Sequence, residues 1–132
     1  MAMLSFSGLD DLAREIARAG EKAKPTVQKM LEAGGAAMED AWKHAIDAAG
    51  LVDTGEMRAS VKAGKITLTD DGGFVEVYPR GKDSRGVRNA DKAFINHYGS
   101  SRIRATAFVD QAEEEGEPAA TAAMEAIWNA QR

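Results

Sequence analysis

The most regular pattern in the sequence is a long run of apolar residues at helical spacing in the first half of the chain. Between residues 27 and 49 the apolar side chains fall on one stripe of a helix, and charged side chains fall on the opposite side. Pro25 suits the first turn of this helix, and Gly50 suits the position just past its end. Gly34 and Gly35 lie inside it, although each glycine costs about 1 kcal/mol of helix propensity. This pair predicts either a kink or a close approach by another backbone.

The residues before this helix predict a strand and a first, shorter helix. Residues 4–7 alternate apolar and polar side chains, which is the two-residue spacing of a strand. Leu9, Leu12 and Ile16 then repeat at helical spacing. We therefore expect this helix to end near Gly20.

In the middle of the chain the spacing changes from helical to alternating. Val61 and Ala63 share one phase of this alternation, and Ile66 and Leu68 share the other. The slip at Gly64 therefore predicts a β-bulge. Residues 70–73, Asp-Asp-Gly-Gly, are a strong turn signal. Residues 74–78 then form the returning strand of a β-hairpin.

Two further helices are expected after the hairpin. Residues 80–90 are polar and basic and predict a loop, after which Asn89 is placed to cap a short helix over residues 90–98. A last helix begins near residue 106, and we expect Gly116 and Pro118 to divide it into two parts.

This order of elements predicts an α+β fold in a single domain over residues 1–132. In it, a long amphipathic helix and a C-terminal helix pack on a small antiparallel sheet built round a β-hairpin.

No combination of residues in the sequence forms a recognisable active site. There is no cysteine, and the two histidines, His44 and His97, lack the spacing of a zinc motif. Phosphate-binding loops and serine-nucleophile motifs are absent. His97 lies beside Tyr98, but no nucleophile or orienting carboxylate is near it in sequence. We therefore expect no catalytic residue, no metal and no cofactor, and a protein that is not an enzyme.

The sequence also gives no sign of a membrane or secretory segment. No apolar run approaches the roughly 20 residues of a membrane-spanning helix. The first residues lack the basic segment and the apolar core of a signal peptide, and the absence of cysteine fits folding in a reducing cytoplasm.

The net charge is −4, but two segments of the chain carry charge of opposite sign. Residues 78–104 carry seven basic and two acidic residues, whereas residues 110–125 carry six acidic residues and no basic one. Such a chain can bind nucleic acid through its basic half, or a copy of itself, basic surface to acidic surface. Alternatively, both segments are merely solvated surface.

Several short motifs occur in an order that resembles a known protein family. Residues 51–61 read LVDTGEMRASV, which resembles the VDTG-x-L-R-x-S signature of siphophage neck and minor tail proteins. Upstream, GLDDL at residues 8–12 is similar to the start of that family and precedes the long helix. Downstream, FINHYGSS at residues 94–101 and RATAF at residues 104–108 are similar to two further family elements. In the second of these, Thr106 and Ala107 stand where the family usually has Arg-Pro.

The resemblance implies a structural virion protein of a tailed phage, acting in head–tail joining or tail completion. It implies a homo-oligomer, in the form of a ring, that contacts neighbouring neck and tail proteins, with the basic region facing a partner or passing DNA. The protein would be assembled in the host bacterial cytoplasm and located in the neck or tail of the virion. The candidate subunit or DNA contacts are then Arg58, Arg80, Lys82, Arg85, Arg88, Arg102, Arg104, Glu113, Glu114 and Glu117.

The signature segment also has a local structural interpretation. Asp53 or Thr54 can cap a short turn, Gly55 tolerates unusual backbone angles, and Met57 faces the core. The segment is then a connector between the long helix and the hairpin. The functional alternative has Arg58 pairing with an acidic surface on a neighbouring subunit.

Two other classes of function remain open at this point. A small nucleic-acid-binding accessory protein would use the basic 80–104 region, with Arg80, Lys82, Arg85 and Arg88, and would lose affinity steeply with salt. A small hydrolase would depend on His97.

Overall fold

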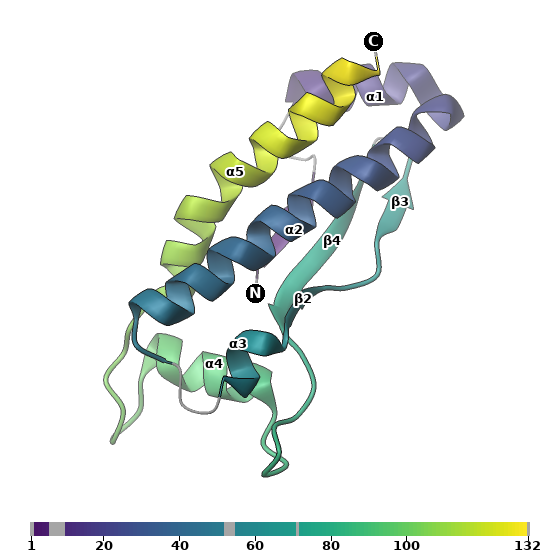
Figure 1. Ribbon diagram of the computed structural model, residues 1–132. Coiled ribbons are helices and arrows are strands. Elements are labelled where there is room, and N and C mark those ends of the chain that lie inside the picture. Colours follow the sequence, from purple (N-terminus) through teal and green to yellow (C-terminus); the bar gives the residue numbers. More distant parts are fainter. Residues whose placement is uncertain (1, 6–9, 52–54, 71, 132) are drawn as a thin grey trace.

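Two long helices lie side by side and form the framework of the molecule (Figure 1). The computed structural model describes residues 2–5, 10–51, 55–70 and 72–131. Helix α2 (Lys24–Ala48) and helix α5 (Phe108–Ala130) run antiparallel and share the largest contact between any two described elements. The expected long helix and C-terminal helix are therefore confirmed.

Helix α5 is continuous, so the expected division at Gly116 and Pro118 is wrong. The ring of Pro118 removes the helical hydrogen bond to the carbonyl oxygen of Glu114. Both residues are exposed, so water can bind that carbonyl oxygen instead. Gly116 lies on the other side of the helix and is buried.

Gly116 allows α5 to approach α2 closely. A Cβ atom at position 116 would lie 3.1 Å from Cβ of Ala41 and even nearer to the end of the Met38 side chain. Elsewhere in the same interface the rings of Trp42 and Phe108 meet edge to face, with centroids 5.7 Å apart, and both are fully buried. The two helices are therefore joined by a close approach at Gly116 and by the packing of the Trp42 and Phe108 rings.

The sheet is antiparallel and has β4 as its central strand. Its strands are β1 (Ala2–Ser5), β2 (Val61–Ala63), β3 (Thr67–Thr69) and β4 (Gly72–Pro79). β1 pairs with one side of β4, and β2 and β3 pair with the other. Ala63 faces Val77 and Thr67 faces Phe74, so the three residues 64–66 stand opposite the two residues 75–76. Three residues opposite two are a β-bulge, which confirms the bulge predicted at Gly64.

One face of the sheet packs on α2, and Gly35 is a point of close approach. A Cβ atom there would lie 3.1 Å from Cβ of Ala63 and 3.7 Å from Cγ1 of Val75. Because α2 continues through this position, the glycine pair marks close packing and not an interruption of the helix. Val75 and Val77 are fully buried, whereas Glu76 between them is exposed on the outer face. The expected α+β fold is confirmed.

The end of α2 has the hydrogen bonds of a Schellman motif. Gly50 donates to the carbonyl oxygen of Asp47 and Leu51 to that of Ile46, both at 3.0 Å, and Gly50 has a φ of +70°. This confirms Gly50 as the residue that ends the helix. The short helix α3 (Glu56–Ala59) follows, entered through Gly55. The caps expected from Asp53 or Thr54 lie outside the described residues.

Helix α1 (Asp10–Ala19) ends just before Gly20, as predicted, and leads through the 3-10 turn η1 (Gly20–Ala23) into α2. The indole Nε1 of Trp128, near the end of α5, donates to Oε2 of Glu15 at 2.6 Å and so ties α5 to α1. The predicted first strand is confirmed as β1, although Phe6 lies outside the described residues.

Helix α4 (Asn89–Tyr98) lies at the end of the molecule where α2 finishes (Figure 1). The expectation that Asn89 caps this helix from outside is wrong. Asn89 is the first helical residue, is 2% exposed, and donates from Nδ2 to the carbonyl oxygen of Arg80 at 3.0 Å. Its buried amide therefore fixes the preceding loop to the helix.

We predict that Gly116→Val destabilises the fold because the new side chain has no room against Ala41. Overpacking of this kind costs about 1–3 kcal/mol. The matched control is Ala119→Val, which introduces the same side chain on the exposed side of α5. Urea unfolding should show a much larger loss for Gly116→Val. Equal losses would mean that the two helices are not in close contact at Gly116.

The α2–α5 contact also contains a pH-dependent pair. Nδ1 of His44 lies 2.8 Å from Oε2 of Glu115, and this hydrogen bond raises the pKa of His44 above 6.5 and lowers the pKa of Glu115. A raised histidine pKa stabilises the fold below pH 6.5, and this contribution is lost as the pH rises through the folded value.

Between pH 6 and pH 8 the Tm of the wild type should therefore fall more than the Tm of His44→Gln. The difference should be small because both side chains are exposed. Thermal unfolding at the two pH values measures this difference. An identical pH response in the variant would contradict it.

Candidate assembly surface

Helix α4 and its two flanking loops carry a group of exposed apolar side chains at one end of the molecule. We call this group, Val87, Phe94, Ile95, Tyr98 and Ile103, the α4 cap. Phe94 and Tyr98 are 58% and 66% exposed, and their ring centroids are 4.8 Å apart across one helical turn. Large apolar side chains gathered on a surface are typical of a binding site. The helical spacing of Phe94 and Tyr98 was visible in the sequence, but their exposure was not.

The inner side of α4 fixes the position of this cap. Ala93 is fully buried. Nδ1 of His97 accepts a hydrogen bond from the backbone N–H of Val109 at 3.3 Å, and its carbonyl oxygen accepts one from Ala107 at 3.1 Å. Nε2 of His97 lies 3.9 Å from Oδ1 of Asp110, which is too far for a hydrogen bond. His97 thus connects α4 to the start of α5.

The loop between α4 and α5 is held by the residues that depart from the family pattern. The hydroxyl of Thr106 donates to the carbonyl oxygen of Asn96 at 2.7 Å. Ala107 has a φ of +50°, a left-handed conformation that proline cannot adopt. The loop that carries Ile103 therefore has a local geometry that an Arg-Pro pair would not reproduce.

Asp83 organises the loop before α4. Its carboxylate accepts hydrogen bonds from the backbone N–H groups of Arg85 and Val87, both at 2.9 Å, and lies 2.6 Å from Nζ of Lys92. The bond from Lys92 and those from the backbone lower the pKa of Asp83 to about 2. The loop predicted over residues 80–90 is thus a compact turn that holds Val87 beside α4.

The basic residues of the 78–104 segment divide into two groups. Arg80 and Lys92 are engaged within the chain. The others are exposed and make no ion pair with any residue in the described ranges: Lys82, Arg85, Arg88, Arg102 and Arg104. These five side chains come from the same two loops as Val87 and Ile103, so the α4 cap lies within a basic end of the molecule.

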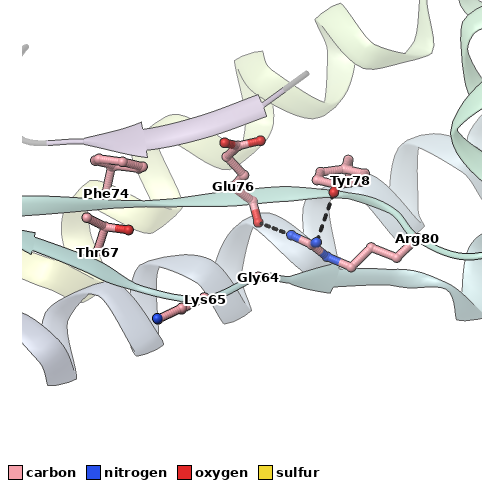
Figure 2. A pocket seen from close by; sticks show the side chains of 7 residues that line it. All are labelled: Gly64, Lys65, Thr67, Phe74, Glu76, Tyr78 and Arg80. Carbon is pink, nitrogen blue, oxygen red and sulfur yellow. Dashed lines mark hydrogen bonds between the residues drawn. The ribbon is translucent and has the colours of Figure 1, made fainter.

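Arg80 holds the bulge of the sheet (Figure 2). Its guanidinium donates at 3.0 Å to the carbonyl oxygens of Lys62 and Glu76 and to the hydroxyl of Tyr78, whose ring it also covers at 4.0 Å. A Cβ atom at Gly64 would collide with this guanidinium. The residues border a shallow, open pocket of about 210 Å³ on the outer face of the sheet.

The acidic segment lies on α5, whose first turn contacts α4. Glu114 and Glu117 are exposed, Glu113 is half-buried, and Glu115 is paired with His44. Pro118, Ala122 and Ala126 are also exposed and follow one another at four-residue spacing along the outer face. This outer face of α5 is therefore a ridge of small side chains with carboxylates beside it.

The signature segment is a connector, as its local interpretation predicts. Gly55 has a φ of +83°, and Met57 is buried. Nε of Arg58 donates to Oδ1 of Asp47 on α2 at 2.8 Å. Arg58 therefore has an acidic partner within its own chain, and both side chains remain partly exposed.

The described ranges contain no group of three or more histidine, aspartate or glutamate side chains placed to hold a metal ion. In the same part of the chain, a search for membrane-spanning helices finds no candidate.

Comparison with known proteins identifies the family. The family model described as "Bacteriophage HK97-gp10, putative tail-component" matches residues 10–100, which is more than half of the chain. The protein therefore belongs to this family of phage tail components, as the motifs indicate, and such membership implies a place in the virion. Helix α5 and the element at Phe108 lie beyond the matched segment. No curated protein and no solved structure matches the chain significantly.

We predict that Asp83→Asn loosens the loop that carries Val87. The depressed pKa means that the carboxylate stabilises the loop above its ordinary pKa of 3.8, and that this contribution is lost as the pH falls toward 2. Hydrogen exchange of the Val87 amide at pH 6 should be faster in Asp83→Asn than in wild type. The control is Asp91→Asn, an exposed position on α4. Equal exchange in both variants would show that Asp83 does not hold the loop.

Proposed function

We propose that this protein is a structural subunit of head–tail joining or tail completion that assembles with copies of itself into a ring. The observation that supports this most is the separation of two exposed surfaces of opposite charge, the basic α4 end and the acidic outer face of α5. In the described ranges, the ion pairs of these two surfaces are those of Lys92 with Asp83, His44 with Glu115 and, at 3.9 Å, His97 with Asp110. Assembly of this kind requires no catalytic group.

Rings are built by heterologous contacts, in which one patch of a subunit meets a different patch of the next. A chain with one cationic and one anionic surface suits this arrangement, since like surfaces of two copies repel each other and unlike surfaces attract. The neighbouring neck and tail proteins are the further partners, and assembly takes place in the host bacterial cytoplasm.

The exposed cations could also contact DNA, which is the alternative function. With Arg80 engaged at the bulge and Lys92 paired with Asp83, Lys82, Arg85 and Arg88 remain for phosphates in the first loop. We favour protein assembly because the α4 cap adds large apolar side chains to these cations, and because the acidic face of α5 repels phosphates.

The test is light scattering on the purified, nuclease-treated protein, alone and with the adjoining neck and tail proteins. We expect a discrete oligomer, or incorporation into a complex with those proteins, and weaker association as salt rises. A strict monomer that binds none of them, but that shifts DNA in a gel at low salt, would overturn the proposal in favour of the alternative.

A further inference from the structure

We propose that the α4 cap of one copy docks on the outer face of α5 of a second copy. This rests on the proposed function and names its contact surfaces: Phe94 and Tyr98 lie over the small-residue ridge, and the arginines beside the cap meet the carboxylates beside the ridge. The contact deepens the proposal because ring assembly alone does not specify which surfaces meet.

The α4 cap has the composition of an interface centre. Aromatic side chains and arginine are enriched at such centres, where rings supply apolar area and arginines supply oriented hydrogen bonds. Phe94 and Tyr98 provide the rings, and Arg102 and Arg104 lie on the loop that also carries Ile103. The cap is preorganised by the bonds of His97 to Val109 and of Thr106 to Asn96.

The outer face of α5 complements it in shape and charge. Pro118, Ala122 and Ala126 have short side chains, so rings of a partner can approach the helix closely. Glu114 and Glu117 stand beside this ridge, and no basic residue occurs in α5. Cations within the bound partner would therefore find only carboxylates on this helix.

Within one chain the small-residue ridge lies beyond the point where α4 contacts α5. Helix α4 contacts α5 near its first turn, through His97 and Val109. Pro118 is ten residues beyond Phe108, about 15 Å further along the helix. A second copy is the favoured occupant because the cap supplies rings and arginines, whereas the α5 face supplies short side chains and carboxylates. A nucleic acid would be repelled by the α5 carboxylates.

Reciprocal charge reversal tests the contact. The first variant carries Arg102→Glu and Arg104→Glu, and the second carries Glu114→Arg and Glu117→Arg. Each variant alone places like charges opposite each other in the proposed contact, so its self-association should weaken by at least about 100-fold in Kd. In a 1:1 mixture the charges at positions 102 and 104 of each cap face opposite charges at positions 114 and 117 of the partner, and light scattering should show the assembled species restored.

Three controls make the result decisive. Lys29→Glu with Lys62→Glu reverses two exposed cations elsewhere and should assemble like wild type. Phe94→Ser with Tyr98→Ser should lose assembly without any change in charge. Circular dichroism on every variant should show an unchanged helical signal, since all substituted side chains are exposed.

Wild-type-like assembly of either charge-reversed variant alone, or a mixture that stays apart while wild type assembles, would overturn this contact and leave the proposed ring intact. A wild type that is monomeric under every condition, including with the neck and tail proteins, would overturn both.

Discussion

Close packing of helix α2 on two sides is the constraint on which the rest of the structure depends. Gly35 brings the sheet to the helix on one side, and Gly116 brings α5 to it on another, in each case at a distance that leaves no room for a larger side chain. Helix α4 meets the rest of the protein at the end of the molecule, through α3, β4 and the start of α5. Its inner residues Ala93 and His97 are used for attachment, and its outer residues are left exposed.

The same arrangement separates the charges. Helix α5 buries Gly116 and Ala120, with Gly116 against α2, whereas its carboxylates Glu114 and Glu117 are exposed. The basic segment is gathered at the other surface by two short loops, one organised by Asp83 and one by Thr106. A tail component built in this way presents two unlike surfaces, and a heterologous contact joins two different surfaces.

Sequence patterns predicted most of the fold, because periodicity and turn chemistry are local. The long helix, its end at Gly50, the bulge at Gly64 and the buried Met57 follow from such signals. The break at Pro118 was wrongly predicted since the exposure of that residue, which makes proline tolerable, depends on how α5 packs. Likewise, the sequence gives no sign that Arg80 is engaged within the chain, because its three hydrogen bonds form only when the sheet brings their acceptors together. The exposure of Phe94 and Tyr98 was equally invisible, as helical spacing does not tell which face is covered.

A photocrosslinker in place of Tyr98 tests whether copies of this tail component assemble through the α4 cap. Assembled protein made from equal amounts of ¹⁵N-labelled and unlabelled copies would be irradiated, digested and analysed by mass spectrometry. If the α4 cap docks on α5 of a second copy, mixed-isotope crosslinks should join position 98 to peptides of residues 108–130 in another copy. Crosslinks confined to a single copy, or to a different surface of the second copy, would contradict it.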